Sequence, residues 1–193
     1  LSSDFGSTSL APGQSTTFVV QMNTASAASY SGTASFGTND ANNNPFSFTL
    51  AGTVVTSTII DNGQAGFSET GSGWTHYTGT GYGNNLDYAA AGSGANTATW
   101  QLTGLASGTY DAQMTWNVVS NHATNATYSV YDGNTLLGTV TVNQQQTPSG
   151  ATVNGTPFQS LGHFTIASGT LKVVLTDNAN GYVIADAFRA VVS

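Results

Sequence analysis

The sequence lacks cysteine and is poor in charged side chains. Of its 193 residues, two are Lys or Arg and nine are Asp or Glu, which gives a formal net charge of −7 at pH 7. Without cysteine there are no disulfides from which a redox compartment could be inferred. Because nucleic acids and anionic membrane surfaces attract proteins largely through Lys and Arg, this charge balance argues against both as partners.

Long hydrophobic runs are also missing. No apolar run approaches the roughly 20 residues that span a bilayer, and the chain does not start with a charged segment followed by an apolar one. We therefore expect no membrane insertion and interpret Leu1 as a processed or excised start. The scarcity of Lys and Arg removes most trypsin-type cleavage points, and Thr-, Asn- and Gly-rich β domains are typical of exposed surfaces. By that association we expect an extracellular or cell-surface protein of bacterial origin.

Turn and strand residues are abundant instead. Gly, Ser, Thr, Asn and Ala dominate, while Trp, Tyr, Phe, Val and Leu recur at regular spacing. Such a composition favours strands over helices, and the recurring apolar residues exclude a disordered chain. The sequence predicts an all-β protein with two domains, residues 1–55 and 56–193.

The first domain shows three segments in which apolar and polar residues alternate, at residues 15–22, 30–36 and 46–51. Period two is typical of strands with one buried face. Turn-forming residues at 10–14 and 39–45 precede the first and third segments. These patterns predict three amphipathic strands.

The same residues resemble a known family. Ser9-Leu-Ala-Pro-Gly-Gln-Ser-Thr-Thr-Phe18, Tyr30-Ser-Gly-Thr-Ala34, Thr38-Asn-Asp40 and Pro45-Phe-Ser-Phe-Thr-Leu-Ala-Gly52 are similar to the second half of Hydin-type immunoglobulin-like repeats of bacterial surface proteins. The resemblance covers residues 4–54 and implies a partial immunoglobulin-like sandwich, since complete domains of this kind have about seven strands.

A partial sandwich leaves an apolar face that needs cover. The second domain could cover it, or the chain could be a fragment of a longer domain. Alternatively, a neighbouring copy supplies strands, and a head-to-tail contact of that kind builds a filament. We expect a self-association face made by four aromatic residues, Phe18, Phe36, Phe46 and Phe48.

The second domain contains further alternating segments. They predict strands at 98–102, 110–118, 128–130 and 137–142, and a closing antiparallel hairpin formed by residues 161–175 and 181–189.

The second domain also carries an ordered set of motifs: Ile59-Ile-Asp-Asn-Gly63 with Gly66-Phe67, Ala98-Thr-Trp100, Gly108-Thr-Tyr110, Trp116, Asn121-His-Ala-Thr-Asn-Ala126, Leu161-Gly-His-Phe164 and Gly181-Tyr-Val-Ile-Ala-Asp-Ala187 with Arg189. With these motifs the domain resembles the golvesin C-terminal-like domain, which is also attached to xanthan lyases, where it is described as similar to a carbohydrate-binding module. The resemblance covers residues 58–192 and implies a jelly-roll-like β-sandwich without catalysis and with a poorly defined ligand.

Catalytic patterns are weak. Glycoside hydrolysis needs two carboxylates at a defined separation, and Glu69 is the single Glu while the Asp residues stand mostly in turn contexts. A polysaccharide lyase could use Asn121, His122, Tyr128 and Arg189, but loop hydrogen bonding by Asn121 and His122 and an ion pair for Arg189 are the simpler interpretation. We predict no enzymatic activity.

Metal and cofactor patterns are equally weak. His76, His122 and His163 lack the close spacing of a zinc motif, and Asp61, Asp177 and Asp186, which jelly-roll domains could use for calcium, lack the spacing of an EF-hand loop. Asp186 lies on an otherwise apolar strand, where we expect backbone donors or Arg189 to satisfy it. We predict no metal and no cofactor.

The segment from Gly71 to Tyr88 is the candidate ligand or interface surface. Its four aromatic residues, Trp74, Tyr77, Tyr82 and Tyr88, stand among Gly, Thr and Asn. Aromatic rings can stack on sugars, anchor a protein interface or simply cover the end of a sandwich.

Two functions follow. The leading prediction is a structural or adhesive bacterial surface protein that self-associates into a filament or layer by strand addition at its incomplete first domain. The alternative is a carbohydrate-binding module that attaches a secreted protein or a cell to polysaccharide.

Overall fold

The computed structural model describes residues 5–7, 9–20, 28–54 and 57–193. They form strands, turns and one short 3-10 turn, η1 (Tyr82–Asn84), and these described residues contain no α-helix. The prediction of an all-β protein is confirmed. None of the described residues belongs to a helix long and apolar enough to cross a membrane. The chain divides into two compact units, Leu1–Thr56 and Ser57–Ser193, which we call the smaller and the larger unit.

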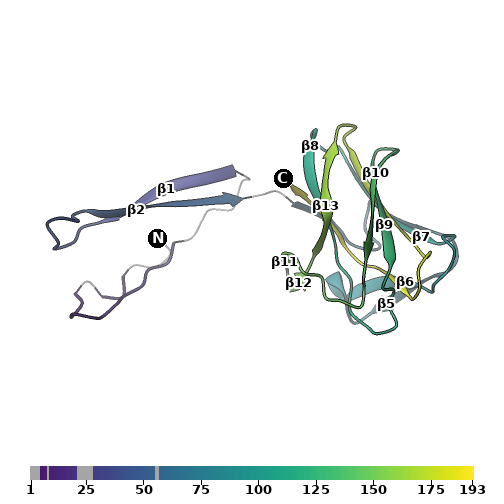
Figure 1. Cartoon of the computed structure of the whole chain (residues 1–193), viewed down its shortest axis with the longest axis horizontal. Helices are drawn as coiled ribbons and strands as arrows, with labels where there is room; N and C mark the ends of the chain where they lie inside the picture. Colours follow the sequence, from purple (N-terminus) through teal and green to yellow (C-terminus); the bar gives the residue numbers. More distant parts are fainter. Residues whose placement is uncertain (1–4, 8, 21–27, 55–56) are drawn as a thin grey trace. The chain divides into compact units, whose positions relative to one another are not determined.

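The smaller unit is built on one antiparallel hairpin of β1 (Ala28–Phe36) and β2 (Phe46–Val54) (Figure 1). The register places Phe36 opposite Phe46 and Ala34 opposite Phe48, so these side chains share a face. Val19 forms a β-bridge, the other described residues from 15 to 20 lie outside strands, and residues 21 and 22 of the first predicted strand lie outside the described residues.

The larger unit contains two main antiparallel sheets. The first has the order β10 (Thr135–Val142), β9 (Ala126–Asp132), β14 (Thr170–Thr176), β7 (Thr97–Thr103) and β4 (Phe67–Thr70). The second has the order β13 (Gln159–Ile166), β8 (Gly108–Met114), β16 (Phe188–Val192) and β3 (Ser57–Ile60).

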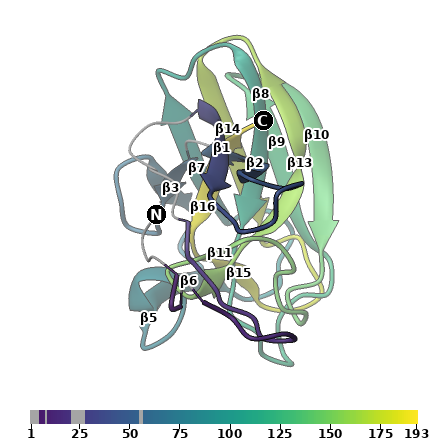
Figure 2. The same cartoon turned by 90° about the vertical axis from the view of Figure 1, so that its left-hand side faces the viewer.

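Two smaller sheets complete the unit. One has the order β15 (Val183–Ala185), β6 (Asn85–Ala89) and β5 (Trp74–Thr78), and the other pairs β11 (Thr152–Val153) with β12 (Thr156–Pro157). Figures 1 and 2 both show β5, β6 and β11 at the same end of the unit. The site described below lies at this end.

A core between the main sheets follows from period-two alternation. Trp100, Val173 and Val130 are cross-strand neighbours in the first sheet, and all three are fully buried. In the second sheet, Met114 lies opposite Phe188, and both are fully buried. Because each strand turns its alternate apolar residues to the same side, the two sheets bury one continuous cluster. The predicted β-sandwich is confirmed.

The predicted closing hairpin is wrong. Strand β13 pairs with β8, whereas β14 pairs with β7 and β9 in the other sheet. Beyond the turn, β15 pairs with β6 and β16 pairs with β8 and β3. Successive strands thus change sheets, because each buries its apolar face by joining a layer rather than its neighbour in sequence. Alternation specifies a strand but not its partner.

Candidate functional site

The larger unit has a pocket of about 450 Å³ at the end that carries β5, β6 and β15. This volume lies within the ~300–1,000 Å³ typical of small-molecule sites. Ten residues line the pocket: Tyr77, Thr80, Leu86, Tyr88, Asn117, Val119, Asn121, His122, Tyr182 and Ile184.

Three tyrosines give the pocket its aromatic character. Tyr77 is 52% exposed on β5, and Tyr182 is 38% exposed just before β15. The rings of Tyr88 and Tyr182 meet edge to face, with their centroids 5.7 Å apart. On β6, Leu86 and Tyr88 both line the pocket, and strand alternation points the intervening Asp87 to the other side. The tyrosines therefore come from three separate segments.

The loop that follows β8 is tied to Tyr182 through the backbone. The Tyr182 N–H donates to the Asn121 carbonyl at 3.1 Å, and the Ala123 N–H donates to the Tyr182 carbonyl at 2.7 Å. Gly181 permits this approach, since a Cβ there would stand 2.8 Å from the His122 carbonyl oxygen. The close contact holds Asn121 and Tyr182 on one wall.

His122 is a structural part of this wall. Its side chain is buried, and its Nδ1 donates to the Asn117 carbonyl at 3.1 Å. Burial lowers the pKa of the imidazole, which keeps the ring neutral at physiological pH. The expected loop hydrogen bonding by Asn121 and His122 is confirmed.

Asn117 supplies an unsatisfied acceptor at the pocket. Its Oδ1 is buried and has no hydrogen-bond partner among the described residues. Buried acceptors without a partner are uncommon in folded proteins.

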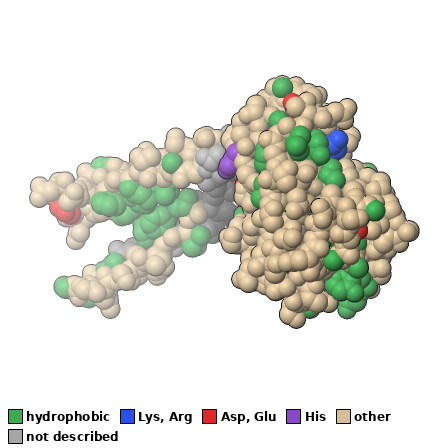
Figure 3. Space-filling view, turned by 45° about the vertical axis from the view of Figure 1, so that its right-hand side comes forward, with side chains coloured by type: hydrophobic (Ala, Val, Ile, Leu, Met, Phe, Trp, Pro, Cys, Tyr) green, Lys and Arg blue, Asp and Glu red, His purple; other side chains and the backbone are tan. Residues whose placement is uncertain are grey.

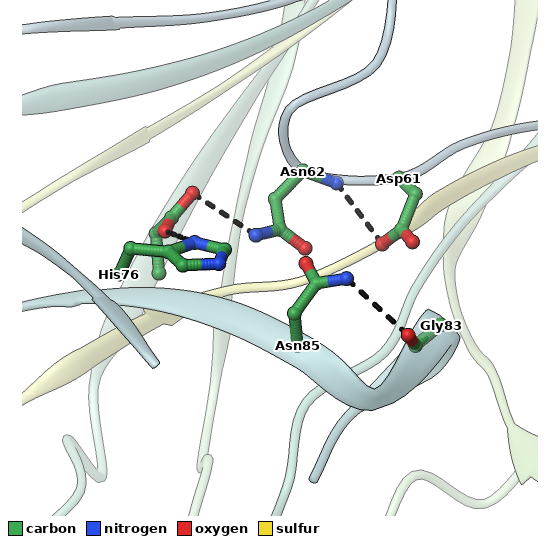
Figure 4. Close-up of polar contacts among 6 residues, drawn as sticks. Asp61, Asn62, His76, Gly83 and Asn85 are labelled. Atoms are coloured by element: carbon green, nitrogen blue, oxygen red, sulfur yellow. Dashed lines mark hydrogen bonds and ion pairs between the residues drawn. The ribbon is translucent and has the colours of Figure 1, made fainter. Parts of the chain in front are cut away.

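A polar network lies on the other side of β6 from Leu86 and Tyr88. His76 Nδ1 contacts Asp87 Oδ1 at 2.7 Å, and Asn62 donates from Nδ2 to Asp87 Oδ2 at 3.1 Å. The Asn62 N–H donates to Asp61 Oδ1 at 3.0 Å (Figure 4). Figure 4 also shows the side chains of Asn62 and Asn85 pointing toward each other, and the Oδ1 atom of each is buried without a partner among the described residues.

Asp186 is the most deeply buried carboxyl group of this region. Both of its oxygens accept the Tyr82 N–H, at 3.0 and 3.1 Å. Burial, with the nearby carboxylates of Asp61 and Asp87, raises the pKa of Asp186 to about 8. Burial likewise raises the pKa of Asp61 to about 6. A backbone donor thus satisfies Asp186, as expected.

The expected ion pair of Arg189 is wrong, because its Nη1 donates to Gln113 Oε1 at 2.9 Å and the described residues form no salt bridge with it.

The four aromatic residues expected from the sequence do not gather in one place. Tyr77 and Tyr88 line the pocket. Trp74 packs against the core with its Nε1 buried, and Tyr82 stacks edge to face on Phe158 at 5.7 Å. Tyr182, absent from the expected set, joins Tyr77 and Tyr88. The sequence signal that could have identified Tyr182 as a site residue is its position directly after Gly181 and next to a strand of buried residues.

The candidate lyase residues are also separated. Asn121 and His122 line the pocket, whereas Tyr128 is fully buried in the core and Arg189 binds Gln113. Asp177, the third candidate calcium ligand, accepts hydrogen bonds from Gly94 and Asn96, both at 2.6 Å. Within the described ranges, no group of three or more His, Cys, Asp or Glu residues is placed to hold a metal ion.

Residues 58–192 match the family model of the golvesin C-terminal domain. The chain belongs to the golvesin C-terminal domain family. The matched range lies within the larger unit, so the immunoglobulin-like resemblance of residues 4–54 stays a prediction. No curated protein matches the chain.

Several solved structures are similar to this golvesin C-terminal domain. A xanthan lyase from Paenibacillus superposes with a TM-score of 0.61 at 29% identity, over 78% of this chain and 14% of the lyase chain. The CBM35 of Abf62 from Cellvibrio japonicus gives a TM-score of 0.49 at 15% identity, over 72% of this chain and 94% of that one. The C-terminal CBM6 of LamC from Zobellia galactanivorans gives 0.49 at 14% identity, over 72% and 100%. The chain therefore spans about one seventh of the lyase.

Proposed function

We propose that this protein is an extracellular, non-catalytic carbohydrate-binding protein whose ligand occupies the tyrosine-lined pocket of the larger unit. The observation that carries the proposal is the combination of Tyr77, Tyr88 and Tyr182 around one pocket with amide side chains beside them. Tyrosine rings offer flat apolar faces to the C–H faces of sugars, and Asn and Thr side chains exchange hydrogen bonds with hydroxyl groups.

The likeness to the xanthan lyase adds support. That enzyme is named for a polysaccharide, and this chain shares the fold of a part of it at 29% identity. The separation of Tyr128 and Arg189 from the pocket favours binding without cleavage.

Affinity electrophoresis of the full chain in polysaccharide-containing gels tests the proposal. We expect weak binding to which each of the three pocket tyrosines contributes. Tyr182→Ala should weaken binding by about tenfold, or ~1.4 kcal/mol, and should leave the thermal unfolding midpoint nearly unchanged because the side chain is 38% exposed.

Tyr131→Ala is the matched control. Tyr131 lies on β9 outside the pocket lining, and its ring carries the ammonium group of Lys172 4.6 Å from the centroid. This variant should bind as the original chain does. The proposal would be contradicted if no polysaccharide in the gel slowed the original chain. It would also be contradicted if Tyr182→Ala and the original chain were retarded equally.

A second function, self-association, is favoured by the smaller unit. Hydrophobic side chains gather there in a patch (Figure 3). The rings of Phe36 and Phe46 lie 5.4 Å apart and those of Phe18 and Phe48 lie 6.1 Å apart, yet Phe46 remains 45% exposed. Exposed apolar patches of this kind are typical of interfaces. A second copy that adds a strand and covers these rings would build the filament or layer expected from the sequence.

Light scattering over a range of concentrations tests self-association. We expect particles that grow with concentration and that become smaller with Phe46→Ser, because a polar side chain removes apolar area from the contact. Ser47→Ala, at the neighbouring position on the opposite face of β2, is the control. A monodisperse monomer at every concentration would contradict self-association and leave the carbohydrate proposal standing.

A further inference from the structure

The pocket has no charged side chain among the described residues that line it. Its polar groups are the amides of Asn117 and Asn121, the hydroxyl of Thr80, the tyrosine hydroxyls and the buried ring of His122. The lowered pKa of His122 follows from burial, so this ring brings no positive charge at neutral pH. The site can therefore exchange hydrogen bonds but cannot neutralise an anion.

Both cationic side chains of the sequence are engaged elsewhere. The sequence holds one Lys and one Arg. Lys172 lies over the ring of Tyr131 at 4.6 Å, and Arg189 is hydrogen-bonded to Gln113 at 2.9 Å. Neither lines the pocket. To bind an anion in the pocket, Lys172 would have to leave the ring of Tyr131, or Arg189 would have to break its hydrogen bond with Gln113.

The chain around the pocket is acidic overall. The nearest carboxylate on β6 is Asp87, which stands between two lining residues with its side chain on the other side of the strand. The whole chain carries a formal charge of −7. A carboxylate or sulfate entering the pocket would lose hydration without a counter-charge and would meet a repulsive field.

We infer that the pocket selects uncharged sugars and rejects uronate-containing and sulfated glycans. This inference rests on the proposed function and narrows its ligand class. Selectivity arises from the missing counter-charge rather than from a specific hydrogen bond, so it should hold across anionic polymers of different linkage.

Affinity electrophoresis with two sets of polymers tests the inference. Galactomannan, xyloglucan and a β-1,3-glucan form the neutral set; alginate, polygalacturonate and xanthan form the anionic set. We expect retardation by at least one neutral polymer and by none of the anionic ones. Binding to the neutral polymer should change less than twofold between about 0.01 M and about 1 M NaCl, where the Debye length falls from ~30 Å to ~3 Å, because no charge pair is screened.

A charge variant tests the cause. Val119 lines the pocket and is 44% exposed, so Val119→Lys places an ammonium group at the rim. This variant should gain retardation by polygalacturonate at low salt and lose it at high salt. Val118→Lys, at the adjacent residue with the same 44% exposure but outside the lining, is the matched control and should gain less.

The outcomes separate the inference from the proposed function. Binding to anionic polymers that Tyr182→Ala abolishes would overturn the neutral-sugar inference and leave carbohydrate binding intact. No binding to either set would overturn both. The chain could bind only neutral polymers while Val119→Lys gains no more retardation by polygalacturonate than Val118→Lys does. That result would overturn the charge explanation and with it the inference.

Discussion

The side chain of Gln144 exchanges two hydrogen bonds with the backbone of Ile184. Its Nε2 donates to the Ile184 carbonyl and its Oε1 accepts the Ile184 N–H, each at 2.9 Å. The same Nε2 donates to the Tyr128 hydroxyl at 2.9 Å. Both Gln144 and Tyr128 are fully buried. A glutamine thus takes the place of a neighbouring strand and fixes the segment that forms one wall of the pocket.

Replacing this glutamine should weaken the larger unit markedly. Gln144→Ala leaves the Ile184 N–H unpaired in the core, and the Ile184 carbonyl keeps only the Tyr128 hydroxyl at 3.4 Å, so we expect the free energy of unfolding to fall by roughly 2–4 kcal/mol. Urea denaturation measures the change. Gln146→Ala, whose side chain is exposed, is the control and should change stability by less than about 0.5 kcal/mol. Equal effects of the two variants would contradict this role.

Stability should fall as the pH rises. The pKa of Asp186 is about 8 in the folded chain against 3.8 for an ordinary Asp. Between these two pKa values the folded state binds more protons than the unfolded state. The stability that protonated Asp186 contributes is therefore fully present below the unfolded pKa of 3.8 and is lost as the pH rises through the folded pKa of about 8. We expect a loss of roughly 3 kcal/mol between about pH 5 and about pH 8.

Thermal unfolding at several pH values checks this expectation. Asp186→Asn keeps an acceptor for the Tyr82 N–H and cannot titrate, so its unfolding midpoint should depend much less on pH over the same window. An unchanged pH dependence in this variant would assign the effect to other groups.

Glycine should be required at position 181. Gly181→Ala would bring its Cβ to 2.8 Å from the His122 carbonyl oxygen and 2.9 Å from that of Asn121, both of which are backbone atoms that cannot rotate away. We expect a destabilisation of about 1–3 kcal/mol, together with weaker ligand binding because the wall beside Tyr182 shifts. Gly108→Ala, whose added Cβ would meet an ordinary contact at 4.0 Å, is the control; a comparable loss there would refute the steric argument.

The larger unit should fold without the smaller one. The core cluster of buried residues is drawn from residues 60–190, so a chain of residues 57–193 should keep the cooperative unfolding and midpoint of the larger unit in the full chain. Circular dichroism melting of both chains gives the comparison. Loss of cooperative unfolding in the shorter chain would show that the two units depend on each other.

Several parts of this protein could be predicted from the sequence. Alternation located β7, β9 and β10 and the hairpin residues of the smaller unit, because side-chain direction in a strand reverses at every residue. The segment from Gly71 to Tyr88 is less regular, and its strands β5 and β6 were not predicted. The strand predicted over 110–118 extends too far, since β8 stops at Met114.

Partners across the molecule were beyond such patterns. Nothing near Gln144 in the sequence indicates that it binds Ile184, forty residues away, or that Asn117 and Tyr182 share a pocket.

The sequence by itself determined the all-β character, the family membership of residues 58–192, the scarcity of cations and the supply of aromatic residues. Tertiary structure decided which tyrosines meet, which carboxyl groups are buried and where β14, β15 and β16 pair. The physical reason is that composition and period-two alternation act between neighbours in sequence, whereas pairing and burial depend on which layer each strand joins.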